Sequence, residues 1–199
     1  MAEFKLAYQK SMNHEGSYSN DPRDRGGETW KGISRKNWPD WEGWKIIDSV
    51  EDKKAINKKL NSNKELEQLV QDFYKTNFWD VLKLDQIEVQ AIAEELFDTG
   101  INTGLNTAAR HFQHALNLMN RNQKDYADLQ TDGKLGERSL KCFEAYMNTA
   151  KTIPGRNIEL LTSAMLKALN GMQFNLYVEI CKNNPEQESF FFGWVTNRT

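Results

Sequence analysis

Cysteine is scarce in this 199-residue sequence, which contains only Cys142 and Cys181. Two cysteines are too few for a disulfide scaffold, and their separation does not match the spacing of metal-ligand pairs. We therefore predict two buried free thiols. His111 and His114 share one face of a predicted helix, but no carboxylate or cysteine clusters near them in the sequence. A metal ion needs more ligands than two imidazoles, so we predict no metal site, and no motif implies a cofactor.

Long apolar runs are also missing. No stretch reaches the roughly eighteen consecutive apolar residues of a transmembrane helix, so we predict no membrane insertion. Residues 1–16 lack the basic stretch, apolar core and small-residue cleavage site of a secretory signal. We expect the chain to be synthesised in the cytoplasm without a signal peptide. It would then reach a substrate outside the membrane only after release or export.

An excess of basic residues is the third absence. The formal net charge is −2, and a protein with this balance is not expected to bind nucleic acid. Attraction to an anionic polymer would have to come from a local patch of positive charge. Aromatic residues are plentiful, at 11% with six Trp, which fits either a dense core or a surface that stacks on flat ligands. The sequence does not indicate an oligomeric state.

Strand-like alternation is rare, and apolar residues instead recur at helical spacing. We predict an all-α fold class, mainly helical, with a small β-hairpin near residues 16–36. The first predicted helix runs towards Glu15, and one of its faces carries Phe4, Ala7, Tyr8, Ser11 and Met12. Residues 16–48 hold most of the turn-forming residues and are expected to be irregular.

The remaining helices are predicted from their start and stop signals. Three capping-box patterns precede apolar helical spacing: Ser49 with Asp52, Ser62 with Glu65, and Asp85 with Glu88. A helix from Gln86 should end or bend at Gly100 and Gly104. Further helices are expected from near Thr107, from Glu137, from Asn157 and, after Pro185, at the C-terminal end, with a polar connection over residues 120–133.

Three residues near the N-terminal end suggest glycosidic bond cleavage. Such cleavage needs an acid that protonates the leaving oxygen and a second group that supports the oxocarbenium-like centre. Glu15 lies at the expected end of an amphipathic helix, where burial raises a carboxyl pKa into the range that an acid catalyst needs. Asp24 lies in a glycine-rich polar loop, where solvent and hydrogen bonds keep it ionised. Thr29 supplies a hydroxyl that could hold a water molecule. The alternative reading is a helix-end carboxylate for Glu15 and turn-capping side chains for Asp24 and Thr29.

The same segment resembles the signature of glycoside hydrolase family 108, which comprises N-acetylmuramidases of phages, prophages and bacteria. The resemblance rests on Glu15-Gly16-Ser17-Tyr18, Asn20-Asp21-Pro22, Asp24, Gly26-Gly27, Thr29 and Gly32-Ile33-Ser34. Ser17 departs from the family motif, which has glycine there. The order Glu15, Asp24, Thr29 is also similar to the catalytic trio of phage-type lysozymes. The resemblance implies a lysozyme-like fold in which Glu15 is the general acid, with Asp24 and Thr29 as its partners.

The second half of the sequence resembles the predicted peptidoglycan-binding domain that usually accompanies this family. The similar segments are Phe97–Gly104, Asp132–Leu140 and Gly193-Trp194 with Asn197-Arg198. We predict a lysozyme-like catalytic region over residues 1–92 and a helical peptidoglycan-binding region over residues 93–199, packed as one compact unit with the cleft between them. Peptidoglycan glycan strands are the implied partner.

Four further residues are candidates for substrate binding. Tyr18 and Trp30 lie inside the signature, and Trp30 is the preferred stacking residue, although a Trp in such a cluster is more often packed in the core. Asp98 and Asn102 lie one helical turn apart. These two side chains either line the opposite wall of the cleft or hydrogen-bond to each other across the helix break.

The function implied by the resemblance is hydrolysis of the β-1,4 bond between N-acetylmuramic acid and N-acetylglucosamine. Two alternatives remain open at this point. One is a non-catalytic wall-binding or secretion-assisting protein on the same scaffold. The other is a lytic transglycosylase, which cleaves the same bond without water.

Overall fold

The computed structural model describes residues 1–12, 17–20, 27–51 and 55–198. The chain divides into two compact units, one formed by Tyr8–Asn77 and the other by Met1–Ala7 together with Phe78–Thr199. Ile92, where the predicted catalytic region ends, lies inside the second unit. The division at residue 92 was drawn from sequence motifs and stays a prediction.

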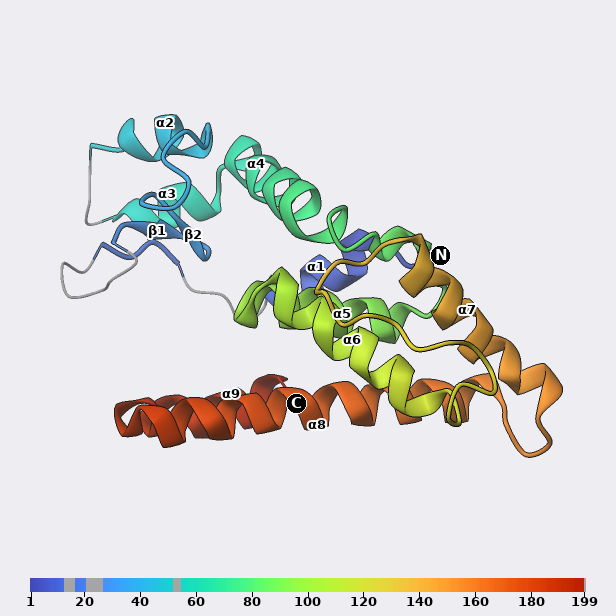
Figure 1. Ribbon diagram of the computed structural model, residues 1–199. Coiled ribbons are helices and arrows are strands. Elements are labelled where there is room, and N and C mark those ends of the chain that lie inside the picture. The colour runs from blue at the N-terminus through green and yellow to red at the C-terminus, as the bar shows by residue number, and fades with distance from the viewer. Residues whose placement is uncertain (13–16, 21–26, 52–54, 199) are drawn as a thin grey trace. The chain divides into compact units, whose positions relative to one another are not determined.

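The unit formed by residues 8–77 is built around a short hairpin and three helices (Figure 1). Its elements are the later part of α1 (Phe4–Met12), β1 (Thr29–Trp30), β2 (Ile33–Ser34), α2 (Gly43–Asp48), α3 (Ile56–Asn61) and α4 (Lys64–Tyr74). The π-helical turn η2 (Lys75–Trp79) leads into the other unit. The predicted inner face of the first helix is confirmed, because Ala7, Tyr8 and Ser11 are all buried.

Helix α4 starts one residue later than the capping-box pattern implied. The N-cap is Asn63, whose Oδ1 accepts a hydrogen bond of 2.9 Å from the backbone N–H of Leu66. Ser62 instead donates from its hydroxyl to the Lys59 carbonyl and closes α3. The backbone decides between them: Asn63 is extended, as an N-cap must be, whereas Ser62 is still helical. The two residues compete for one role, and their order in the sequence did not resolve it.

The other two capping-box patterns are those of Ser49 with Asp52 and of Asp85 with Glu88. Asp52 lies outside the described residues. Asp85 lies within the 3₁₀ turn η3 (Leu84–Gln86), and α5 begins only at Gln90, after an N-cap Val89 that makes no side-chain cap bond. The helix predicted from Gln86 therefore starts four residues late. A 3₁₀ turn comes first and places Leu84 and Ile87 in the core.

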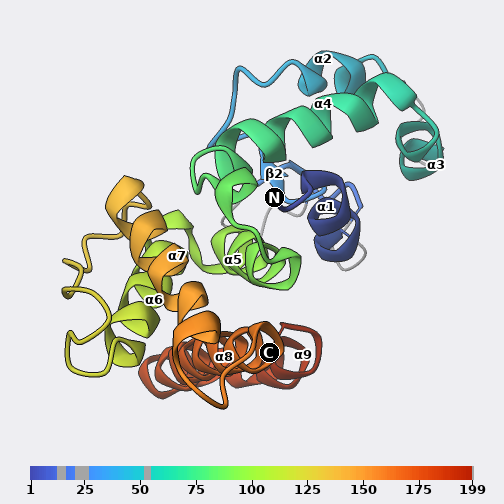
Figure 2. The same ribbon diagram turned by 90° about the vertical axis from the view of Figure 1, so that its right-hand side faces the viewer.

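The second unit is entirely helical in its described part (Figures 1 and 2). Its helices are α5 (Gln90–Thr103), α6 (Leu105–Met119), α7 (Glu137–Thr152), α8 (Ile158–Asn183), the 3₁₀ turn η4 (Pro185–Gln187) and α9 (Glu188–Arg198). Helix α8 is the central element, since α5, α6, α7 and α9 all pack against it. The predicted starts at Glu137 and after Asn157 are confirmed, and Asn157 caps α8 by accepting from the Leu160 N–H at 2.8 Å.

Gly104 separates α5 from α6 and does so with a single residue. Its φ of +93° lies in the region that favours glycine, so one position ends α5 and starts α6. The predicted break at Gly104 is confirmed, and Gly100 stays within α5, where a Cβ would lie 3.2 Å from Leu82 Cδ1. Helix α6 then begins at Leu105, two residues ahead of the predicted start.

The N-terminal residues belong to the core of this second unit. The ring of Phe4 meets those of Trp79 and Phe97 edge to face, at centroid distances of 5.7 and 5.8 Å. The Ala2 N–H donates to the Ile87 carbonyl at 2.8 Å, and the Glu3 N–H donates to Gln90 Oε1 at 2.7 Å. Residues 1–7 therefore complete a hydrophobic core whose other members lie more than seventy residues further along the chain.

These observations confirm the predicted fold class, mainly α-helical with one small hairpin. Cys142 and Cys181 are buried free thiols, as predicted. None of the helices in the described ranges has both the length and the apolar character needed to cross a membrane.

Candidate active site

The hairpin is the first element of the candidate site. Strands β1 and β2 are antiparallel, with Thr29 opposite Ser34 and Trp30 opposite Ile33. The two residues that connect them, Lys31 and Gly32, have φ of +44° and +81°. A two-residue hairpin turn with positive φ at both positions matches the right-handed twist of the strands. The hairpin thus forms within residues 16–36, where the sequence predicted it.

Thr29 is held on both sides. Besides its partner Ser34, it forms a two-way bridge with Ser19: the Ser19 N–H donates to the Thr29 carbonyl at 3.0 Å, and the Thr29 N–H donates to the Ser19 carbonyl at 2.8 Å. The segment between Ser19 and Thr29 contains Asp24. Its two ends are therefore fixed opposite each other by backbone hydrogen bonds.

Helix α4 holds the turn of the hairpin. Lys31 Nζ lies 2.6 Å from Glu67 Oε2, and the Tyr74 hydroxyl donates to the Lys31 carbonyl at 2.7 Å. The Tyr8 hydroxyl donates to the other oxygen of Glu67 at 2.9 Å. A non-glycine residue with positive φ costs about 1–2 kcal/mol. Contacts at both the backbone and the side chain of Lys31 offset that cost and fix the turn.

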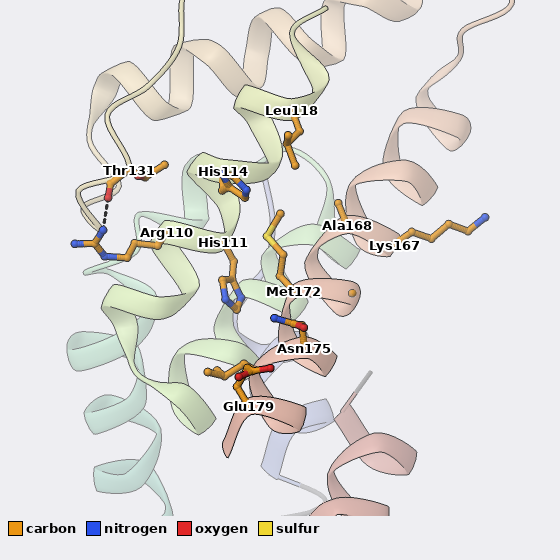
Figure 3. A pocket seen from close by; sticks show the side chains of 12 residues that line it. Arg110, His111, His114, Leu118, Thr131, Lys167, Ala168, Met172, Asn175 and Glu179 are labelled. Carbon is orange, nitrogen blue, oxygen red and sulfur yellow. Dashed lines mark hydrogen bonds between the residues drawn. The ribbon is translucent and has the colours of Figure 1, made fainter. Parts of the chain in front are cut away.

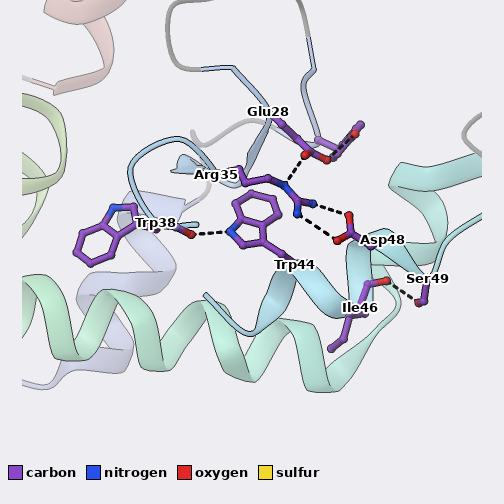
Figure 4. Close-up of polar contacts among 8 residues, drawn as sticks. Glu28, Arg35, Trp38, Trp44, Ile46, Asp48 and Ser49 are labelled. Atoms are coloured by element: carbon purple, nitrogen blue, oxygen red, sulfur yellow. Dashed lines mark hydrogen bonds and ion pairs between the residues drawn. The ribbon is translucent and has the colours of Figure 1, made fainter. Parts of the chain in front are cut away.

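Arg35 holds the other end of the hairpin, directly after β2 (Figure 4). Its Nε lies 2.5 Å from Glu28 Oε2, while Nη2 and Nη1 meet the two oxygens of Asp48 at 2.5 and 3.1 Å. The guanidinium lies 4.4 Å from the ring centroid of Trp44, within cation–π distance. Hydrogen bonds to Asp48, and then to Glu28, raise the pKa of Arg35 above its ordinary value although burial opposes the shift. Arg35 therefore joins β1 to α2 through a permanent charge.

Tyr18 completes this network. Its hydroxyl donates to Glu28 Oε1 at 2.8 Å, and its backbone N–H donates to Asn57 Oδ1 at 2.9 Å. Burial, followed by the hydrogen bond to Glu28, raises the pKa of Tyr18, so the phenol stays a hydrogen-bond donor at neutral pH. Its hydroxyl is thus committed to Glu28. A role for Tyr18 in substrate binding stays a prediction.

Of the three predicted catalytic residues, Thr29 alone lies in the described part of the chain. Glu15 and Asp24 lie outside the described residues. Thr29 is placed on β1 with a partly exposed side chain, in the bridge described above. The roles of all three residues therefore stay predictions.

The tryptophans are arranged differently from the preferred prediction. Trp30 is only 1% exposed and lies in the core, so neither face of its ring is open to a sugar. Trp38 is 41% exposed, and its ring meets Phe73 edge-on at 4.9 Å. The stacking role assigned to Trp30 does not fit this burial. Its position inside the signature favours Trp30 as the stacking residue. Strand alternation argues against this role, because it turns the side chain inwards beside buried Ile33.

Asp98 and Asn102 are bonded to each other on α5. Asn102 Nδ2 donates to Asp98 Oδ2 at 2.8 Å and to the Asp98 carbonyl at 2.9 Å. The two side chains thus hydrogen-bond to each other, but within α5 and not across the break at Gly104. Asn102 also borders a pocket of about 460 Å³ with Tyr177 and Trp194, within the second unit. Their predicted place on the wall of a cleft between the two halves stays a prediction.

Sequence reasoning missed Glu28, Arg35 and Asp48. Glu28 and Arg35 flank the hairpin symmetrically, and opposite charges at the two ends of a two-strand hairpin are a signal for a cross-strand pair. Asp48 carries no such signal, because its contact with Arg35 depends on how α2 returns to the hairpin.

Comparison with known proteins supplies the class. Residues 8–104 match the family model described as Glycosyl hydrolase 108, and residues 107–199 match the model described as Predicted Peptidoglycan domain. A solved structure titled "Structure of Brucella abortus SagA" is similar with a TM-score of 0.60 and 18% sequence identity, over 97% of this chain and 87% of that one. At this identity the likeness shows the fold alone. No curated protein matches the chain.

The match over residues 8–104 supports a glycoside hydrolase-type enzyme. More particularly, residues 8–104 match the glycosyl hydrolase 108 family and residues 107–199 match the predicted peptidoglycan domain, as the motifs predicted. The two matches together support a peptidoglycan hydrolase.

Proposed function

We propose that the chain is an N-acetylmuramidase that hydrolyses the β-1,4 bond between N-acetylmuramic acid and N-acetylglucosamine in peptidoglycan. The observation that carries the proposal is the family match over residues 8–104, because Glu15, Asp24 and Thr29 all lie inside it. In this scheme Glu15 protonates the glycosidic oxygen. Asp24 stabilises the developing cation or positions water, and the Thr29 hydroxyl assists.

The described geometry supports a fixed place for one member of this trio. The bridge from Ser19 to Thr29, the anchor of Lys31 on α4 and the anchor of Arg35 on α2 hold β1 from three directions. A hydroxyl that orients water must be held within a fraction of an ångström of its working position, and a strand held this way meets that need. The exposed ring of Trp38, in the same unit, is the aromatic surface best suited to stack on a sugar.

The substrate of this proposal lies in the bacterial cell wall. The enzyme would act there after release or export, and the predicted peptidoglycan domain would bring it to the polymer. No nucleic acid and no cofactor takes part in the proposed reaction.

The test is Glu15→Gln measured on purified, insoluble peptidoglycan. Removing a general acid lowers the rate by roughly 10²–10⁴-fold. We expect a loss of that size in the release of reducing ends, with unchanged thermal unfolding. The matched control is Glu42→Gln, the same change at a side chain that is 72% exposed on the same unit, and it should keep wild-type activity. Undiminished activity of Glu15→Gln would refute Glu15 as the acid.

Product analysis by mass spectrometry separates the alternatives. Muramidase action leaves N-acetylmuramic acid at the new reducing end. Anhydro-muramic ends would instead show a lytic transglycosylase. Binding to peptidoglycan without any new ends would show a non-catalytic wall-binding protein.

A further inference from the structure

A groove runs between α6 and α8 in the second unit, whereas the hairpin belongs to the other unit (Figure 3). Its volume is about 720 Å³, within the range of small-ligand sites. His111, His114 and Leu118 line it from α6, and Ala168, Met172 and Asn175 line it from α8. All its lining residues fall inside the segment that matches the predicted peptidoglycan domain.

The charges along the groove favour an anionic ligand. Arg110 at its edge donates from Nε to Asn106 Oδ1 at 2.7 Å and from Nη1 to the Thr131 carbonyl. Both partners are neutral, so the positive charge of Arg110 remains at the groove. Lys167 on α8 also borders the groove, but its side chain extends away from His111 (Figure 3). The single carboxylate among the lining residues, Glu179, is paired with Lys182 at 2.7 Å. The groove is therefore locally positive although the whole chain carries −2.

His111 supplies an unsatisfied polar atom at the same place. Its Nδ1 is buried and has no hydrogen-bond partner among the described residues. Burial, together with the neighbouring His114, lowers the pKa of His111, so the ring is neutral at neutral pH. A buried polar atom without a partner is costly, and a ligand group that reaches it would remove that cost. Figure 3 shows the ring of His111 between the two helices, near Met172 and Asn175.

The surface of the groove suits a peptide better than a glycan. None of its lining residues, all of which are described, is Phe, Tyr or Trp, the side chains on which sugar rings stack. Ala168 and Gly171 leave a shallow apolar floor that can accept methyl-sized side chains. Peptidoglycan joins neutral amino sugars to short peptides that carry carboxylates and alanine methyl groups. Of these two components, only the peptide matches both the charge and the floor.

We propose that the groove between α6 and α8 binds the acidic stem peptide of peptidoglycan, with a carboxylate towards Arg110 and a backbone amide at His111. The proposal rests on the proposed function in taking peptidoglycan as the polymer. In this proposal the C-terminal half binds the peptide, and the hairpin site binds the glycan.

The test uses the full-length chain and a free stem tetrapeptide, which contains no glycosidic bond. Calorimetry or NMR titration then reports binding whether or not the chain cleaves glycans, so the two proposals fail separately. We expect saturable binding that weakens as salt rises, since exposed charges are screened. Replacing the peptide carboxylates by amides should weaken binding by at least about tenfold, the effect of roughly 1.4 kcal/mol.

Two variants locate the site. Ala168→Trp fills the groove and should abolish peptide binding, and His111→Phe keeps a ring but removes Nδ1 and should weaken it about tenfold, as loss of one buried hydrogen bond does. The matched control is Ser163→Trp, the same bulky residue at an exposed position of α8 that does not line the groove. It should bind normally, and all three variants should unfold at wild-type temperature within a few degrees.

Three results would overturn the proposal. One is the absence of saturable binding to the tetrapeptide. Another is equal binding by Ala168→Trp and Ser163→Trp. The third is binding of chitotetraose, a neutral glycan without peptide, that Ala168→Trp abolishes, because the groove would then take the sugar chain.

Discussion

At the scale of single residues, Arg35 makes the most contacts in the hairpin network. It pairs with Glu28 directly before β1 and with Asp48 at the end of α2, and its planar guanidinium lies over Trp44. A lysine at this position would keep the charge but could not make the fork to Asp48 or lie flat on the indole. The geometry therefore requires arginine specifically.

We expect Arg35→Lys to lower the free energy of unfolding by about 1–3 kcal/mol, the range for charge-assisted hydrogen bonds. Activity should fall as well, because β1 carries Thr29. Chemical denaturation measures the first effect and reducing-end release the second. Lys45→Ala is the control: its pair with Glu42 is 3.5 Å long between side chains that are 81% and 72% exposed, and such pairs contribute about 0–1 kcal/mol. Equal destabilisation by the two changes would contradict a special role for Arg35.

The residue scale also shows where sequence reasoning was limited. Burial of Trp30 follows from strand alternation once β1 is placed, but its rank as a stacking residue came from its position in the motif. The contact of Arg35 with Asp48 is tertiary, since the two positions are thirteen apart in the sequence and Asp48 ends α2. No local pattern encodes it.

At the scale of elements, the turn before α7 explains the glycine at position 133 in the segment Asp132–Leu140. Gln113 is buried on α6 and donates from Nε2 to Asp132 Oδ1 at 2.9 Å and to the Lys134 carbonyl at 3.0 Å. Its Oε1 accepts from the Gly133 N–H at 3.0 Å. One amide therefore holds the whole turn, and the same turn supplies the Thr131 carbonyl that fixes Arg110 at the groove.

Gly133→Ala should destabilise the chain by about 1–3 kcal/mol, the usual size of strain at a left-handed position. Gly133 has φ of +78°, and a Cβ there would lie 2.1 Å from Asn106 Nδ2. Gly136→Ala is the control within the same motif, because its φ is −101° and nothing lies within 4 Å of its would-be Cβ. Thermal unfolding of the two variants measures the difference. Similar melting temperatures would show that Gly133 is not conformationally required.

Elements were the level that the sequence predicted best. The apolar faces of α1, α4 and α6 and the starts of α7 and α8 follow from local spacing and caps, which act within a turn or two. The late start of α5 does not, because Leu84 and Ile87 are drawn into the core by partners elsewhere in the chain.

At the scale of the molecule, the second unit is discontinuous in sequence. Residues 1–7 pack with residues 78–199, and the whole of the other unit is inserted between them. Helix α1 belongs to both, with Phe4 in one core and Tyr8 in the other. Motif boundaries alone could not reveal this, because seven residues carry no recognisable pattern.

Phe4→Ala should therefore destabilise the unit that contains residues 78–199, by about 2–4 kcal/mol for a largely buried aromatic. Hydrogen exchange should rise around Trp79 and Phe97, the two rings that Phe4 contacts. The control is Leu6→Ala on the same helix, whose side chain is 47% exposed and should cost less than about 1 kcal/mol. Faster exchange confined to residues 8–77 would contradict the assignment of the N-terminal segment.

This arrangement also orders events during synthesis on the ribosome. Glu3 leaves the exit tunnel long before Gln90, its partner 87 residues later, has been translated. The contacts described above for the hairpin, α2, α3 and α4 join residues within 8–77, so this unit can fold before the N-terminal segment finds its partners. We expect its seven residues, although made earliest, to be among the last to reach their native contacts, so a nascent chain halted before residue 79 would leave Phe4 exposed to chaperones.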